Sequence, residues 1–167
     1  MKKVLLATIA FSLVFTACRK DRNNDISYQV NENTSVALWK GSTSETSNDG
    51  SFQVTSTKLT INNNSVVSGN FIIPIASIKN FNLPDELKPV LINHLKSADF
   101  FNIALHPEAK FTIKTIRPYI GNGDGAITGA NQFVTGDFSM IGKTLSISFP
   151  AKRGAPYLVS TVADRPA

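Results

Sequence analysis

Apolar and polar residues alternate along most of the chain after about residue 35. In the run 144–149, for example, leucine, isoleucine and phenylalanine alternate with threonine and serine. A period of two with many Thr, Ser, Val, Ile and Phe residues is typical of half-buried antiparallel strands. The pattern recurs in these further runs: 35–40, 51–55, 58–61, 67–75, 110–114 and 134–140. Several strands at regular spacing predict an all-β sandwich or barrel.

Turn-forming residues separate these runs, at 47–50, 62–64, 121–125 and 142–143. The Gly-Asn-Gly-Asp-Gly run at 121–125 also invites comparison with a calcium loop. An EF-hand loop needs several oxygen ligands and a glutamate about six residues after its invariant glycine. This run holds a single carboxylate, so we interpret it as a glycine-rich hairpin turn.

One segment, 84–97, breaks the alternation. Leu87, Leu91 and Leu95 recur there at helical spacing. Pro89 is tolerated only in the first turn of a helix, because it lacks an amide hydrogen and its ring clashes with the preceding turn. The spacing therefore predicts a short helix over about 88–97.

The N-terminal segment has the composition of a secretory signal. Two lysines precede an apolar stretch at 4–14, and small residues precede Cys18. The stretch is shorter than the ~20 residues of a membrane span. The segment resembles the lipobox of a bacterial lipoprotein, which implies cleavage after Ala17 and lipidation of Cys18. The alternative is a secreted protein with a free thiol. In the lipoprotein interpretation, residues 1–17 are the signal peptide, residues 18–25 are the lipidated cysteine with a polar tether, and residues 26–167 are the folded domain.

The charge balance changes this picture little. The precursor has 17 basic and 12 acidic residues, and loss of Lys2 and Lys3 with the signal lowers the net charge from +5 to +3. The basic residues are scattered, without the aromatic interleaving of a nucleic-acid groove. We therefore expect no nucleic-acid partner.

Candidate catalytic and metal-binding residues are few. The only histidines are His94 and His106, and a lipidated Cys18 leaves no thiol for a Cys/His zinc site. A site completed by Asp99 or Glu108 is conceivable. The favoured interpretation is that His94 anchors a helix end by hydrogen bonding and that His106 is an exposed residue before Pro107. No nucleophile elbow, paired-carboxylate motif or phosphate loop appears. The sequence predicts no enzyme, no catalytic residue, no metal and no cofactor.

The most specific stretch lies between residues 75 and 111. It reads Ile-Ala-Ser-Ile-Lys-Asn at 75–80, Asn-His-Leu-Lys-Ser-Ala-Asp-Phe-Phe at 93–101 and His-Pro-Glu-Ala-Lys-Phe at 106–111. These blocks resemble the YceI-like family, as do Trp39 and the later run 136–149. The similarity extends with few gaps from about residue 27 to 150.

The resemblance implies a lipocalin-like antiparallel β-barrel in the cell envelope, on the periplasmic side or the cell surface. It also implies that a polyisoprenoid or quinone-like lipid is bound inside the barrel, for carriage or sequestration. Each buried methylene contributes at most ~0.8 kcal/mol, so a few isoprene units could hold such a ligand. A metal-dependent envelope stress or redox factor and a ligand-free interaction module stay open as alternatives.

Alternation defines two faces of each strand but not which face is inside. We expect the ligand wall to consist of inward-facing aromatic and aliphatic residues, namely Trp39, Phe52, Phe71, Ile73, Phe100, Phe111 and Phe138.

Two departures from the family pattern stand out. The segment 44–51 lacks the histidine that the family often carries there. At the C-terminus, Asp164-Arg165 matches a family dipeptide, but Pro166 follows at once and the final strand is missing. The sequence therefore predicts a barrel without its last strands. A truncated reading frame and a shorter barrel closed by a partner, such as a second copy in a homodimer, both stay open.

Overall fold

The structure is a computed structural model, and it describes residues 25–63, 65–121, 127–154 and 159–160. The predicted signal peptide, Cys18 and most of the predicted tether lie outside the described residues, as do the loop residues 122–126 and the C-terminal residues 161–167. The elements are β1 Ile26–Tyr28, β2 Val36–Ser42, β3 Ser47–Gln53, β4 Thr55–Asn62, β5 Ser65–Pro74, a 3-10 turn Ile75–Ser77, β6 Lys79–Asn80, α1 Lys88–Lys96, β7 Glu108–Pro118, β8 Gln132–Met140, β9 Lys143–Arg153 and β10 Val159–Ser160.

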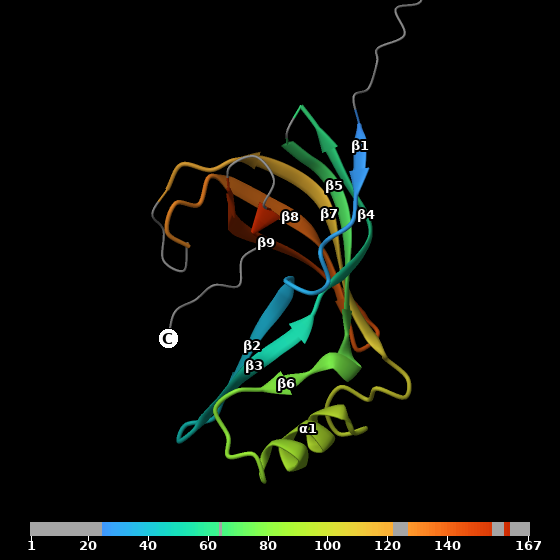
Figure 1. The fold of residues 1–167 in the computed structure, drawn as a ribbon, viewed down its shortest axis with the longest axis vertical. Helices are drawn as coiled ribbons and strands as arrows, with labels where there is room; N and C mark the ends of the chain where they lie inside the picture. The colour runs from blue at the N-terminus through green and yellow to red at the C-terminus, as the bar shows by residue number, and fades with distance from the viewer. Residues whose placement is uncertain (1–24, 64, 122–126, 155–158, 161–167) are drawn as a thin grey trace, which may run out of the picture.

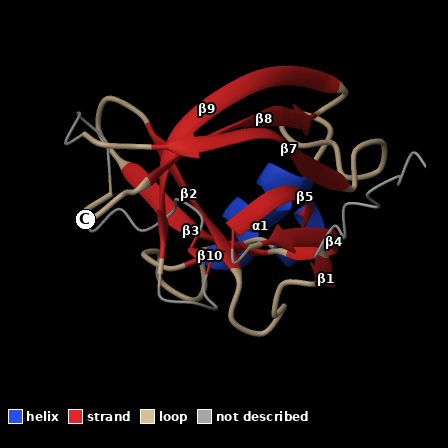
Figure 2. Cartoon of the chain, turned by 90° about the horizontal axis from the view of Figure 1, so that it is seen from above, coloured by secondary structure: helices blue, strands red, loops and turns tan. Residues whose placement is uncertain are grey.

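The strands form two antiparallel sheets, which confirms the predicted all-β class with one short helix. The large sheet has the order β1-β4-β5-β7-β8-β9-β10 and the small sheet the order β2-β3-β6. Figures 1 and 2 show that the large sheet curves strongly, and that α1 covers one end of the curve.

The sequence predicted a barrel without its last strands, and in the described part of the chain the two sheets do not close into a complete barrel. There, β2 pairs only with β3, and the stretch 143–150 of β9 pairs only with β8. Two strand edges are therefore left without a described partner, and the two sheets are held together by side-chain packing and not by a continuous ladder.

The turn expected at 47–50 was wrong. These residues belong to β3, and the β2–β3 hairpin closes earlier, with Thr43 N–H donating to the carbonyl of Thr46 at 2.8 Å. The Thr43 hydroxyl also accepts from the amides of Glu45 and Thr46 at 3.3 and 3.1 Å. The Ser-Asn-Asp-Gly composition favours a turn locally, but pairing with β2 and β6 holds it extended.

The turn expected at 142–143 is confirmed, since Met140 pairs with Lys143 across a two-residue loop. Ile141 and Gly142 in that loop both have positive φ, at 50° and 69°. Two positive φ angles match the right-handed twist of the flanking strands, and glycine adopts them without steric cost.

The helix is confirmed at Lys88–Lys96, with Pro89 in its first turn as expected. Its end is capped by Ser97, whose hydroxyl donates to the carbonyl of His94 at 2.8 Å. Leu95 is the buried residue of this helix. In the described part of the protein, no helix is long and apolar enough to cross a membrane.

The core consists of two apolar clusters. The sheet cluster lies in the large sheet and comprises Leu59, Val66, Phe71, Phe111, Ile113, Val134 and Ala151. The helix cluster lies between the small sheet, α1 and the large sheet and comprises Phe52, Ile75, Ile78, Leu95 and Ala109. Phe138 packs against both clusters and so links the two halves of the core.

Candidate functional site

Three of the expected ligand-wall residues form a row across the large sheet. Phe71 of β5 lies opposite Phe111 of β7, and Phe111 lies opposite Phe138 of β8. The rings of Phe71 and Phe111 stack with their centroids 6.3 Å apart and an interplanar angle of 28°. Directly opposite residues share a face of the sheet, so the register places all three on one side.

This side is the concave one. Phe111 of β7 and Phe149 of β9 belong to strands separated by β8, yet their ring centroids are only 5.4 Å apart. The close approach is possible because Gly136 of β8 leaves room beneath: a Cβ there would come within 2.5 Å of Phe111 Cζ. We call the side that carries Phe71, Phe111, Phe138 and Phe149 the inner face.

The inner face is apolar but incompletely covered. Leu145 of β9 lies opposite Phe138 and shares its face, yet its side chain is 67% exposed. Ile147 and Phe149 further along β9 are half-buried. Among the described residues, no large side chain is less than 2% exposed. The inner face therefore offers apolar surface that the described residues do not cover.

The other expected wall residues lie outside this row. Phe52 is buried in the helix cluster, and Trp39 and Ile73 pack against the same cluster. Phe100, in contrast, is 48% exposed, and its ring meets Phe101 edge-on at 4.8 Å. It is Phe101 that packs against the helix cluster. Whether any of the seven residues contacts a ligand stays a prediction.

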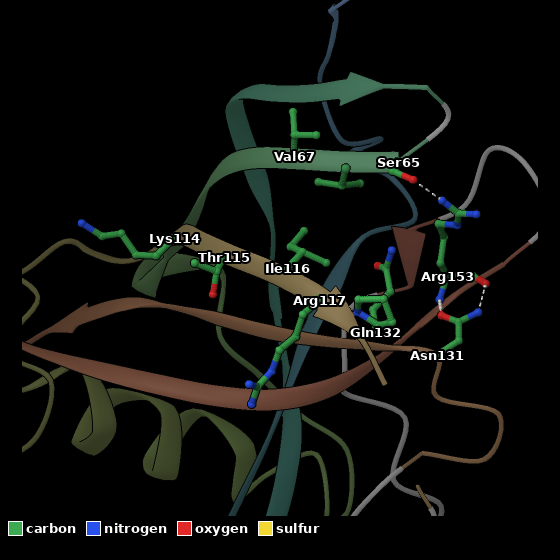
Figure 3. A pocket seen from close by; sticks show the side chains of 11 residues that line it. Ser65, Val67, Lys114, Thr115, Ile116, Arg117, Asn131, Gln132 and Arg153 are labelled. Carbon is green, nitrogen blue, oxygen red and sulfur yellow. Dashed lines mark hydrogen bonds between the residues drawn. The ribbon is translucent and has the colours of Figure 1, made fainter. Parts of the chain in front are cut away.

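A pocket of about 660 Å³ opens at a different place, in the wall of the large sheet. Strands β5 and β7 are paired only from Asn70–Thr112 to Pro74–Glu108, and beyond Asn70 they separate. Figure 3 shows the pocket between the two diverging strands. Its lining residues are Ser65, Val66, Val67, Lys114, Thr115, Ile116, Arg117, Pro118, Asn131, Gln132 and Arg153.

Sequence reasoning missed this opening, although a signal was present. Apolar residues of β7 alternate up to Ile113, but the next apolar residue is Ile116, three positions on. The register of β7 against β8 shifts at the same place, between Ile113 and Thr115, as in a β-bulge. A bulge bends its strand and increases the local twist. The break in period was therefore a sign that β7 turns away from β5.

Three cations line the opening. Arg153 reaches from β9 to β5, where its Nη1 donates to the hydroxyl of Ser65 at 2.6 Å (Figure 3). Arg117 lies over the ring of Phe133, 4.8 Å from the ring centre, and Lys114 pairs with Asp137 at 2.9 Å. Among the described residues that line it, none carries a carboxylate. The described lining therefore carries three cationic side chains, while Val66 and Ile116 connect the opening to the sheet cluster.

The two histidines and the acids considered for a metal site, Asp99 and Glu108, are not among the lining residues of this opening. His94 is exposed on α1, His106 is half-buried, and Glu108 pairs with Lys110 at 3.2 Å. Within the ranges that the structure describes, no group of three or more His, Cys, Asp or Glu residues gathers as for a metal ion.

Comparison with known proteins identifies the family. The YceI-like domain model matches residues 28–164. BcnA of Burkholderia cenocepacia has a TM-score of 0.50 at 20% identity, with 72% of this chain and 69% of BcnA covered. The YCEI protein of Campylobacter jejuni has a TM-score of 0.41 at 16% identity, with 91% and 68% covered. A search of curated proteins finds no match. The likeness to BcnA supports the fold alone, whereas the domain match spans most of the sequence: the chain belongs to the YceI-like family.

Proposed function

We propose that this protein is an envelope lipoprotein that binds a polyisoprenoid or similar long apolar lipid on its inner face, as a carrier or sequestering protein. The observation that carries the proposal is the exposed apolar surface beside Phe138. Leu145 is 67% exposed although it shares the face of a core aromatic residue. Apolar side chains on the concave side of a sheet are normally covered, so a bound apolar chain accounts for them.

The energetics suit a flexible apolar chain. Burial of each methylene contributes about 0.8 kcal/mol, so several isoprene units can offset the entropy lost when a lipid is immobilised. Aromatic rings such as Phe111 and Phe149 offer flat contact surfaces without unpaired polar groups. Binding of this kind needs no reactive side chain, because the lipid is held and is not chemically changed.

The proposed anchor places the domain next to its ligand. Lipidation of Cys18 would leave only a short polar tether before β1 begins at Ile26. A Cys18→Ala variant is expected to leave the membrane fraction and to lack the mass of the lipid. A variant that still sediments with membranes and carries lipid would contradict the anchor, but not the binding site.

The binding proposal is tested by two neighbouring substitutions on β9, Leu145→Gln and Ser146→Gln. Both residues are exposed, so neither change opens a cavity, but they point to opposite faces of the strand. Protein purified from membranes is extracted with organic solvent, and the extract is analysed by mass spectrometry. We expect a long-chain lipid with the parent protein and with Ser146→Gln, and a several-fold smaller amount with Leu145→Gln. Absence of lipid from the parent protein, or equal amounts in both variants, would contradict the proposal.

A further inference from the structure

We propose that the end of the domain that carries β1 docks onto the surface of an anionic lipid bilayer. This inference rests on the lipid anchor of the proposed function, and it adds which surface of the domain meets the membrane. We call the surface formed by Ile26, Tyr28, Val67, Arg117 and Ile120 the docking surface.

The docking surface lies at one end of the large sheet. Ile26 of β1 lies opposite Ile61, close to where β4 ends and β5 begins. Val67 belongs to the start of β5, and Ile120 follows the end of β7. The start of β5 and the end of β7 line the same opening, so they lie at the same end of the sheet. Figure 1 shows β1 at this end and α1 at the opposite end of the molecule.

The apolar side chains of the docking surface are open to solvent. Ile120 is 101% exposed, so no described residue covers any part of it. Ile26, Tyr28 and Val67 are also exposed. Contact with a bilayer would remove water from all four side chains at once, which is favourable in proportion to the apolar area buried.

An aromatic pair with a cation lies beside Ile120. Tyr119 stacks on Phe133 with the ring centroids 5.8 Å apart, and the guanidinium of Arg117 lies 4.8 Å from the centre of the same Phe133 ring. Tyrosine and arginine side chains suit the headgroup region of a membrane, because each has an apolar part and a polar tip that stays hydrated. The neighbourhood of Ile120 therefore has the composition of a membrane interface.

The length of the tether decides which end of the domain faces the bilayer. Cys18 and the six residues after it precede the first described residue, Asp25. Fully extended, seven residues span at most about 25 Å. The ten residues of β5 span roughly 30 Å, and α1 adds about 10 Å beyond the end of β5 (Figure 1). The anchor therefore cannot hold α1 against the membrane with β1 pointing away, although Leu87 and Val90 on the α1 side are exposed as well.

The charge of the tether favours an anionic surface. Arg19, Lys20 and Arg22 follow the predicted lipidated cysteine, with Asp21 as the one acid among residues 19–24. The next acid, Asp25, accepts a hydrogen bond from the side-chain amide of Asn62 at 2.7 Å. Anionic lipids attract basic residues next to a membrane anchor, and salt weakens the attraction. The anchor keeps the domain close to the bilayer, so weak contacts suffice for docking although they would not hold an unanchored protein there.

Docking in this orientation would bring the apolar core next to the bilayer. Ile26 and Tyr28 lie opposite Ile61 and Leu59, and directly opposite residues share a face of a sheet. Leu59 belongs to the sheet cluster and Ile61 packs against it. The apolar surface of the sheet cluster therefore continues to the docking surface, so a lipid that moves between membrane and inner face stays in contact with apolar side chains.

The experiment measures which end of the anchored protein touches the acyl chains. Lipidated full-length protein is reconstituted into vesicles of phosphatidylcholine and phosphatidylglycerol whose acyl chains are partly brominated. Because lipid occupies the thiol of Cys18, Ile120→Cys and Val90→Cys each introduce a single reactive thiol, which is labelled with a fluorophore. Bromine quenches only a fluorophore that reaches the acyl chains. We expect several-fold stronger quenching at position 120 than at position 90. It should weaken without phosphatidylglycerol and in 1 M salt, where the Debye length is about 3 Å.

A matched pair of variants tests the rest of the docking surface. Ile26→Gln and Leu87→Gln change side chains that are 56% and 51% exposed, at opposite ends of the domain. Each is combined with the label at Ile120→Cys. We expect Ile26→Gln to lower the quenching several-fold and Leu87→Gln to leave it unchanged.

The outcomes separate this inference from the proposed function. Equal quenching at both labels, or none at Ile120→Cys, overturns the docking, while solvent extraction of the same protein still reports whether a lipid is bound. Equal effects of Ile26→Gln and Leu87→Gln also overturn it. Quenching that does not depend on phosphatidylglycerol overturns the choice of an anionic surface. A mass without lipid at Cys18 overturns the anchor, and this inference with it.

Discussion

The indole nitrogen of Trp39 donates a 3.0 Å hydrogen bond to the carbonyl oxygen of Lys79, and the ring spans Gly50 to reach it. Trp39 on β2 lies opposite Gly50 on β3, and Gly50 lies opposite Asn80 on β6. One side chain therefore connects all three strands of the small sheet. The indole nitrogen of Trp39 is bonded within the small sheet, while its ring packs against the helix cluster.

Gly50→Ala should strongly destabilise the protein, because the new methyl group would overlap the Lys79 carbonyl and the Trp39 indole. Backbone atoms cannot move away as side chains can, so we expect a loss of about 2 kcal/mol or more in the free energy of unfolding. Urea unfolding followed by circular dichroism measures it. Gly41→Ala on β2 is the control, since its Cβ would have no heavy atom nearer than 4.0 Å. Equal losses in the two variants would contradict the tight contact.

Phe138→Ala should strongly destabilise the protein, because Phe138 packs against both clusters. We expect a loss of about 3 kcal/mol from the cavity and the lost burial. Phe100→Ala is the matched control: Phe100 is 48% exposed, so its removal should cost under about 1 kcal/mol. Thermal unfolding of both variants provides the comparison. A larger loss for Phe100→Ala would mean that the two clusters are not coupled through Phe138.

Asn131→Ala should weaken the attachment of Arg153, the last residue of β9. The variant loses both hydrogen bonds between the Asn131 amide and the Arg153 backbone, at 2.8 and 3.0 Å. We expect a stability loss of about 1–2 kcal/mol and faster hydrogen exchange at the Arg153 amide. Asn93→Ala on the exposed face of α1 removes an amide of the same type and should leave that exchange unchanged. Unaltered exchange in Asn131→Ala would show that other contacts hold Arg153.

Lys88→Ala should raise the pKa of Asp85 toward its usual value. A hydrogen bond from the Lys88 ammonium, at 2.8 Å, and then its charge lower the pKa of this carboxyl. Because the folded-state pKa is lowered, the pair stabilises the protein above the unfolded-state pKa. The contribution is lost as the pH falls through the folded-state value. Asp85 is fully exposed, so the effect on stability should be small.

Carbon-13 NMR titration of the Asp85 carboxyl measures this shift. Lys96→Ala, at the other end of α1, removes the same charge and should leave the Asp85 titration unchanged. An unchanged Asp85 pKa in Lys88→Ala would contradict the pairing.

Local patterns predicted the seven longer strands, the helix and the 142–143 turn, but not the short strands β1, β6 and β10, and they failed where distant residues intervene. The run 47–50 has turn composition, yet Asp49 N–H donates to the side chain of Asn82 at 3.1 Å. The carbonyl of Asp49 also accepts a hydrogen bond from the Phe81 amide at 3.0 Å. These partners come from the segment after β6. Their hydrogen bonds satisfy an extended backbone, and a propensity for turns is too weak to compete.

The sequence by itself determined the all-β class, the position of α1 and which neighbouring residues share a face, because a strand repeats every two residues and a helix every 3.6. Only the tertiary structure decided which face is inside, since that depends on register between distant strands. It placed Phe71, Phe111 and Phe138 in one row and left Phe100 exposed. It also opened the wall between β5 and β7, where Arg153 bonds Ser65, a residue 88 positions earlier in the chain. No local period encodes a contact at that separation.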